Sequence, residues 1–134
     1  MKRVLVAIDD SQEAKAALAH ALEQFPDATI HVVHALETST VTFDLDSTVT
    51  EEAREEAETI LEGAETTANE SGRTVETRVI FGHAAKAVVS YADDNDIDQI
   101  VVGSRGASGA ERLLLGSVAE TIVRRAACPV TVVR

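Results

Sequence analysis

Short runs of β-branched and aliphatic residues alternate with segments of helical periodicity along the whole chain, and this alternation restricts the fold more than any other feature of the sequence. Strands that alternate with helices predict an α/β fold with a mostly parallel sheet. The runs are Arg3 to Ile8, Thr29 to Leu36, Thr74 to Phe81, Gln99 to Val102 and Val130 to Val133. The first and fourth runs are almost continuously apolar, as strands covered by helices on both faces must be, so we expect them at the centre of the sheet.

The helical segments between these runs are Ser11 to about Gln24, Glu51 to Asn69, Ala84 to Asp94 and Ser117 to about Ala126. Each places its apolar residues on one face, which we expect to pack on the sheet. Asp10 and Ser11 supply the turn and the cap before the first helix. The polar segment Thr38 to Thr50 has no helical period and predicts either a loop, which could act as a lid, or a frayed extension of the second strand. With 134 residues, the chain has the size of a single domain.

The formal net charge of -11 argues against nucleic acid and anionic membranes as partners, because the field of the whole protein would repel both. An anionic ligand must therefore be held by local groups. Lysine makes up only three of the twelve basic residues. This balance fits adaptation to a high-salt cytoplasm, and it equally fits an ordinary acidic protein.

No charged and then apolar leader precedes the first strand, and no apolar run approaches the roughly 18 residues that cross a bilayer. We therefore expect a cytoplasmic protein. The single cysteine, Cys128, rules out an internal disulfide and supplies too few ligands for a structural zinc site. Its place before Pro129 and the last strand predicts a small, buried apolar side chain.

The ends of the predicted strands hold the candidate binding residues, because ligands of open parallel sheets bind beyond the carboxyl ends of the strands. After the fourth strand the chain reads GSRGASGAERLLLGS, with glycines at 103, 106, 109 and 116. Glycine lets the backbone approach a ligand closely. Ser117 and Glu120 form an S-x-x-E pattern that predicts a capping box, and the free N–H groups of a helix start favour a phosphate. A few such hydrogen bonds give roughly -8 kcal/mol, or micromolar affinity, which suits an abundant nucleotide.

The glycine pattern is neither of the two best-known phosphate loops, since the sequence lacks G-x-x-x-x-G-K-[ST] and has no G-x-G-x-x-G after the first strand. It reads G-x2-G-x9-G-S over Gly103, Gly106, Gly116 and Ser117. This pattern resembles the ATP-binding signature of the universal stress protein family. The runs VAIDDS, HVVHA, FGHA and CPVTVV extend the resemblance over nearly the whole chain. The resemblance implies a single open five-stranded parallel sheet of order 3-2-1-4-5, with helices on both faces.

The resemblance also implies which residues bind the nucleotide. Asp9 matches an aspartate beside the ribose or adenine, and Ala35 matches a residue whose backbone contacts adenine. The glycines along the phosphates correspond to Gly103 and Gly106, and the segment from Gly116 to Val118 corresponds to the one that holds the phosphate tail. The expected site comprises Ile8, Asp9, Ala35, Val102, Gly103, Arg105, Gly106, Gly116, Ser117 and Val118. The expected ligand is ATP, with Mg²⁺ to offset repulsion from the acidic surface.

Simpler roles stay open at several of these positions. Asp9 has equal grounds as an N-cap of the first helix, and the glycine loop could be a plain turn from strand to helix. Asp10 stands where many family members have glycine, and a second carboxylate near phosphates is unfavourable unless it faces away or holds a metal. Arg105 and Arg112 could contact phosphate or lie at the surface or at a subunit interface.

His31 and His34 are three residues apart on one predicted strand and point to opposite faces, so they predict no shared metal site. No histidine stands at a readable spacing to activate Ser117 as a nucleophile. We therefore expect a regulatory or stress-response protein that binds a nucleotide and is not an enzyme, although slow hydrolysis of ATP stays open.

Two other functions fit parts of the sequence. One is an interaction module of the same fold that binds no nucleotide. The other is a phosphoacceptor receiver domain, which is disfavoured because Phe81-Gly82 stands where an aspartate should end the third strand and Arg134 where a lysine should follow the fifth. The run Pro129 to Arg134 would be an edge strand, and unpaired edges seek partners, so we expect a homodimer through this strand.

Overall fold

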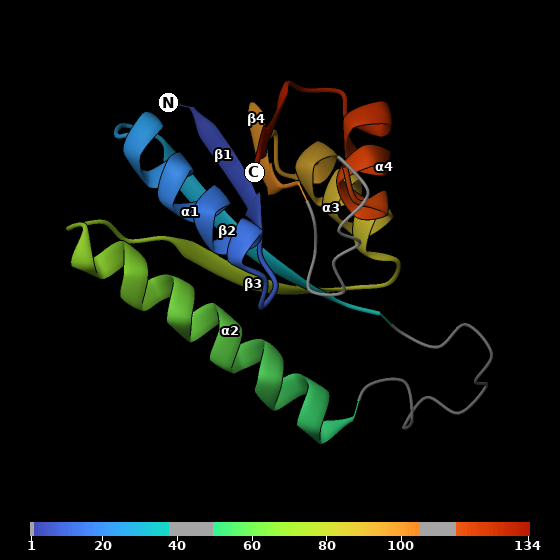
Figure 1. Cartoon of the computed structure of the whole chain (residues 1–134), viewed down its shortest axis with the longest axis horizontal. Helices are drawn as coiled ribbons and strands as arrows, with labels where there is room; N and C mark the ends of the chain where they lie inside the picture. Colours follow the sequence, from blue (N-terminus) through green and yellow to red (C-terminus); the bar gives the residue numbers. More distant parts are fainter. Residues whose placement is uncertain (1, 38–49, 105–114) are drawn as a thin grey trace.

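The computed structural model describes residues 2–37, 50–104 and 115–134, and these ranges hold five strands and four helices in strict alternation (Figure 1). In chain order the elements are β1 Arg3–Ala7, α1 Gln12–Gln24, β2 Thr29–Leu36, α2 Glu51–Glu70, β3 Glu76–Phe81, α3 Ala84–Asp94, β4 Gln99–Gly103, α4 Ser117–Arg125 and β5 Val130–Val133. Every element expected from the sequence is present. The predicted loop from Thr38 to Thr50 lies outside the described residues, except for Thr50.

The strands form one parallel sheet in the order β3-β2-β1-β4-β5, which confirms the expected architecture. Leu5 of β1 pairs with His31 of β2 on one side and with Ile100 of β4 on the other. Val4, Leu5 and Val6 have no exposed surface at all. The apolar runs of β1 and β4 therefore mark the central strands, as predicted.

Helices cover both faces of the sheet, with α1 and α2 on one face and α3 and α4 on the other (Figure 1). The side chains between sheet and helices form two aliphatic clusters, as alternation of side chains along each strand requires. The cluster under α1 and α2 includes Val4, Val6, Leu18, Ile30, Val32 and Leu61. The cluster under α3 and α4 includes Leu5, Val33, Val88, Ile100, Val102 and Ile122.

Some strand ends differ from the predicted bounds because pairing, rather than apolarity, sets them. The strand β3 begins at Glu76 instead of Thr74, since Glu76 is the first residue that pairs with β2, opposite His31. The strand β4 extends one residue further, because Gly103 pairs with Val133 of β5.

Hydroxyl side chains cap the first two helices. The Ser11 hydroxyl accepts a hydrogen bond from the Ala14 amide at 3.1 Å, and Thr50 caps α2 in the same way through the Ala53 amide at 3.0 Å. These bonds satisfy one of the N–H groups that each helix start leaves without a partner. The cap predicted at Ser11 is confirmed.

Cys128 is only partly buried, so the prediction of a buried side chain is wrong in degree. It packs against the cluster under α3 and α4, and this burial raises the pKa of its thiol. In the ranges that the structure describes, no helix combines the length and apolarity that crossing a membrane requires.

Candidate functional site

A cleft of about 380 Å³ lies at the carboxyl ends of the central strands. In the order β3-β2-β1-β4-β5, the chain crosses from β1 to β2 in one direction and from β4 to β5 in the opposite direction. The connections therefore diverge between β1 and β4. This divergence opens the crevice in which doubly wound domains bind ligands. The volume is within the range of small-molecule sites, about 300 to 1,000 Å³.

All the predicted site residues that the structure describes line this one cleft. They come from three strand ends and one helix start, which are far apart in the sequence. They are Ile8, Asp9, Ala35, Val102, Gly103, Gly116, Ser117 and Val118. The remaining two predicted residues, Arg105 and Gly106, lie outside the described residues, as does Arg112.

The turn after β1 is held by Asp9. Its Oδ1 accepts hydrogen bonds from the Ser11 amide at 2.8 Å and from the Ser11 hydroxyl. The N-cap of α1 is Ser11 and not Asp9, so the capping alternative for Asp9 is wrong. Asp9 instead stabilises the turn that carries the cap, and it lines the cleft as well.

Asp10 does not line this cleft. It is exposed and lies 3.7 Å from the ammonium of Lys15, on the first turn of α1. The second carboxylate of the Asp9-Asp10 pair is therefore directed away from the cleft and toward Lys15 of the helix that follows it. This removes the conflict with phosphates that the sequence raised at Asp10.

The backbone N–H and C=O of Ala35 are open to the cleft because the pairing of β1 with β2 ends before this residue. The Ile8 amide still donates to the Val33 carbonyl at 2.8 Å, but the register of the pair ends at Ala7 and Val33. Peptide groups of successive residues in a parallel strand face opposite neighbours. The Leu36 carbonyl faces β3, where it accepts from Gly82, so the N–H and C=O of Ala35 face the space beyond the end of β1.

The start of α4 supplies hydrogen-bond donors on the other side of the cleft. Its N-cap is Gly116, in an extended conformation, and within the part of the chain that the structure describes no side-chain hydrogen bond caps the helix. The Gly116 amide donates to the Ser104 carbonyl at 2.6 Å, and the first intrahelical bond runs from the Glu120 amide to Gly116. The amides of Ser117, Val118 and Ala119 therefore lack intrahelical acceptors, and all three residues line the cleft.

The predicted capping box of Ser117 and Glu120 is wrong. Because Gly116 occupies the N-cap, Ser117 is already the first helical residue and its hydroxyl cannot bond forward to the Glu120 amide. The Glu120 carboxylate pairs instead with Arg124, one turn later, at 3.0 Å. The consequence favours binding, since the helix start keeps its free amides.

The two histidines of β2 have separate partners, as their predicted opposite directions imply. His31 is buried; its Nδ1 lies 2.9 Å from the Tyr91 hydroxyl, and its Nε2 lies 3.2 Å from the Glu76 carboxylate. His34 lines the cleft, and its Nδ1 lies 2.8 Å from the Ile8 carbonyl oxygen. Burial lowers the pKa of His31 and raises that of Tyr91, but both belong to the sheet–α3 contact and not to the cleft.

The sequence did not point to several residues that complete the cleft. Ala84 and Val88, from the first turns of α3, form part of its apolar wall, and Ala14 of α1 and Glu37 after β2 also line it. Among the described residues, no side-chain hydrogen bond caps α3 either. The expected strand order could have indicated these residues of α3, because the helix that connects β3 to β4 must cross over β2 and β1.

An open parallel sheet with a cleft at its switch point, bordered among the described residues by two helix starts without side-chain caps, defines a doubly wound α/β fold with a candidate ligand site. The cleft can hold a flat apolar group against aliphatic side chains, with peptide groups of Ala35 at one edge and the amides of α4 at an anionic end. The model of the Universal stress protein family matches residues 1–134, and the chain belongs to this family.

Individual relatives agree with this assignment. A Staphylococcus haemolyticus protein that carries the universal stress protein name is 36% identical over 140 residues, which cover 99% of this chain and 84% of the relative. The universal stress protein UspA from Lactobacillus plantarum has a similar structure, with a TM-score of 0.86 and 26% identity over 99% of this chain and 97% of that one. A universal stress protein in complex with cAMP has a TM-score of 0.76 and 27% identity, and covers 99% of this chain and 97% of its own.

Proposed function

We propose that this protein binds an adenine nucleotide, ATP together with Mg²⁺, in the cleft between β1 and β4, and that it has a regulatory or stress-response role rather than an enzymatic one. The observation that carries the proposal is the convergence of two sets of free peptide groups on one cleft. Ala35 offers an N–H and a C=O at the apolar end, and the start of α4 offers three amides. The structural relative in complex with cAMP supports a nucleotide as the ligand.

The two ends of the cleft suit the two ends of such a ligand. The side chains of Val33, Val88 and Ile122 give an aliphatic surface for the base, which loses little when it leaves water. The amides of Ser117 and Val118 point toward the phosphates, where each charge-assisted hydrogen bond contributes about 1.5 to 3 kcal/mol. Such local bonds can hold an anion on a protein with a net charge of -11.

The metal would reach the site bound to the phosphates. Within residues 2–37, 50–104 and 115–134, no group of three His, Cys, Asp or Glu side chains could hold a metal ion. Asp9 and Glu37 line the cleft, and Mg²⁺ bound to the phosphates would screen them from these two carboxylates.

Calorimetric titration with magnesium-ATP tests the proposal, and we expect micromolar affinity. Ser117→Pro is the sharpest variant, because proline at the first helical position removes one amide without breaking an intrahelical bond. Gly116 already has the extended conformation (φ -69°, ψ 160°) that a following proline requires. We expect at least about tenfold weaker binding of ATP from the loss of one charge-assisted hydrogen bond.

Ser117→Ala is the matched control, since it removes the hydroxyl and keeps the amide. AMP should lose less affinity than ATP in the Ser117→Pro variant, because AMP lacks the phosphates farthest from the base. A flat titration of the natural protein up to millimolar ATP would overturn the proposal. Unchanged ATP binding by a folded Ser117→Pro variant would overturn the assignment of α4 to the phosphates.

The proposal includes a homodimer through the segment Pro129 to Arg134. The strand β5 is the last strand of the sheet, with β4 as its single neighbour in the sheet order. Its residues Val130 and Val132 are only half-buried. Apolar side chains on an unpaired strand edge favour pairing with a second copy.

A further inference from the structure

His34 takes the place of a missing backbone hydrogen bond between β1 and β2. The register of the two strands, continued by one step, would pair the Ala35 amide with the Ile8 carbonyl. That pairing does not form, although the preceding bond, from the Ile8 amide to Val33, does. The Ile8 carbonyl oxygen lies 2.8 Å from Nδ1 of His34 instead.

We infer that His34 is a positioning residue that keeps the backbone N–H and C=O of Ala35 free to bind the base of the nucleotide. The inference rests on the proposed function, because it assigns the base to these two groups. A carbonyl oxygen only accepts hydrogen bonds, so Nδ1 of His34 carries the proton and the neutral ring is the Nδ1–H tautomer.

Without the imidazole of His34, the Ile8 carbonyl oxygen would lack its hydrogen-bond donor. Ile8 is 6% exposed, and a buried carbonyl that loses its donor must find another. The Ala35 amide is the donor that the strand register brings next to it. Pairing of these two groups would extend the sheet by one step and withdraw the Ala35 N–H from the cleft. The imidazole thus satisfies the carbonyl and spares the amide.

The free N–H and C=O of Ala35 select among bases, because a base must place an acceptor against the N–H and a donor against the C=O. Adenine offers a ring nitrogen that accepts next to an amino group that donates, which complements an N–H beside a C=O. Hypoxanthine offers the reverse order. When the ribose and phosphates hold the base in place, the wrong order leaves buried polar groups unpaired, and sites of this kind reject such analogues.

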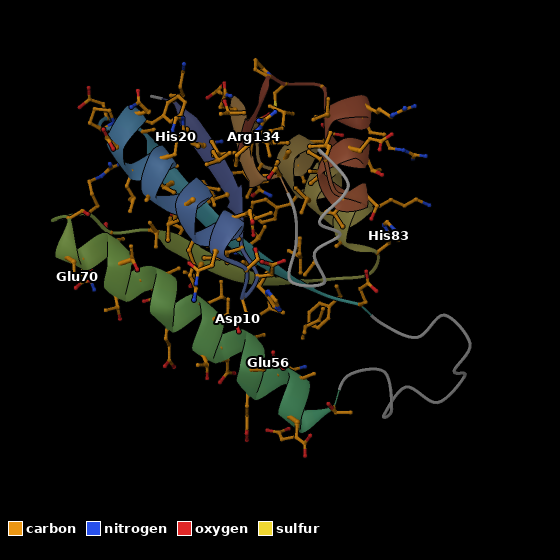
Figure 2. All side chains as sticks on the ribbon, in the orientation of Figure 1. Asp10, His20, Glu56, Glu70, His83 and Arg134 are labelled. Carbon is orange, nitrogen blue, oxygen red and sulfur yellow. The ribbon has the colours of Figure 1, made fainter. Side chains whose placement is uncertain are left out.

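Binding of ATP and of inosine triphosphate to His34→Leu and His34→Asn tests this role. Leucine has no donor, whereas the amide nitrogen of asparagine, like Nδ1, is attached to Cγ and can donate to the same carbonyl. We expect about tenfold weaker ATP binding in His34→Leu, with little change for inosine triphosphate or inorganic tripolyphosphate, and recovery to within about threefold in His34→Asn. His20→Asn is the control, because His20 does not line the cleft and lies toward the end of α1 that is far from the turn at Asp10 (Figure 2).

Hydrogen exchange of the Ala35 amide tests the same role without any nucleotide. We expect this amide to exchange quickly in the natural protein and at least about tenfold more slowly in His34→Leu, where it pairs with Ile8. Nitrogen NMR of the His34 ring should show the Nδ1–H tautomer. Unchanged exchange in His34→Leu, or unchanged preference for ATP over inosine triphosphate, would overturn the inference. If the natural protein binds no ATP while the exchange rates change as expected, the proposed function fails and the role of His34 in the backbone stands.

Discussion

Gly103 lies so close to Glu13 that a Cβ added to the glycine would stand 2.6 Å from the Glu13 carbonyl carbon and 2.8 Å from the Ala14 nitrogen. The end of β4 therefore touches the backbone of the first turn of α1, with only glycine hydrogens between them. This contact explains Gly103 by packing alone. The role of Gly103 beside phosphates stays a prediction, and a substitution at this position would disturb the fold before it reported on a ligand.

We predict that Gly103→Ala lowers the free energy of unfolding by about 1 to 3 kcal/mol, because overpacking against backbone forces β4 and α1 apart. Urea unfolding measures the change. Gly63→Ala is the opposite control, since Gly63 lies inside α2, has a φ compatible with alanine, and has no described atom beyond its neighbouring residues and the backbone of its own helix within 4 Å of an added Cβ. It should stabilise the protein by about 0.5 to 1 kcal/mol. Equal stability of the Gly103→Ala and natural proteins would contradict the packing role.

Local patterns were sufficient to predict the elements, and the family resemblance was sufficient for their order. Helical spacing in Ala84–Asp94 predicted the bounds of α3, because the apolar stripe of a helix depends only on its own residues. The predicted residues Asp9, Ala35 and Ser117 line one cleft because the carboxyl ends of parallel strands meet at one edge of the sheet.

Contacts between distant segments could not be predicted in this way. The start of α4 depends on the hydrogen bond from the Gly116 amide to Ser104, so the S-x-x-E pattern at Ser117 gave the wrong cap. Arg73 donates to the carbonyls of Leu22, Phe25 and Ala28, which joins the end of α2 to the end of α1 across about fifty residues of sequence. Neither contact has a local signature.

We predict that His31 makes stability depend on pH near neutrality. Burial lowers the pKa of His31 below its ordinary value of 6.5, Glu76 opposes this effect, and Arg3 and Arg78 add to it. As the pH falls below 6.5, the unfolded chain binds a proton that the folded protein resists, so the free energy of unfolding falls. In His31→Gln this decrease, up to about 1 kcal/mol per pH unit, should disappear between about pH 6.5 and 5.5.

Urea unfolding at several pH values measures this slope. His20→Gln serves as the control, because His20 lies on α1, away from the contact between His31 and the Tyr91 hydroxyl. A slope that is the same in His31→Gln and in the natural protein would assign the effect to other groups.

We predict that salt stabilises the protein through α2. Eight of the twenty residues of this helix are glutamates, and its only basic residue is Arg54. The glutamates extend along the helix, since Glu56 and Glu70 lie toward opposite ends of it (Figure 2). Glu52 and Glu56 are four residues apart, where like charges repel. Glu56→Lys replaces this repulsion by attraction and should raise the free energy of unfolding by about 0.5 kcal/mol at low salt. Glu56→Gln, which only removes the repulsion, should give about half the gain.

The gain should disappear at about 1 M NaCl, where the Debye length is about 3 Å. The natural protein itself should melt at a higher temperature as NaCl increases, because salt screens the repulsion among its carboxylates. A stabilisation by Glu56→Lys that is independent of salt would point to helix propensity and not to charge.

We predict that Val132→Pro separates the proposed dimer into monomers and leaves each monomer folded. The bonds from the Ile100 amide to Pro129 and from the Ser104 amide to Val133 show that alternate residues of β5 direct their peptide groups toward β4. The amide of Val132 therefore points outward from the edge, where a backbone carbonyl of a second copy would accept its hydrogen bond. Proline removes that donor without breaking the bonds to β4, and edge strands tolerate proline.

Light scattering at micromolar concentration should give the mass of a dimer for the natural protein and for Val132→Thr, which keeps the amide, and the mass of a monomer for Val132→Pro. A natural protein that is monomeric under these conditions would contradict the proposed dimer. A Val132→Pro variant that stays dimeric would place the interface elsewhere on the surface.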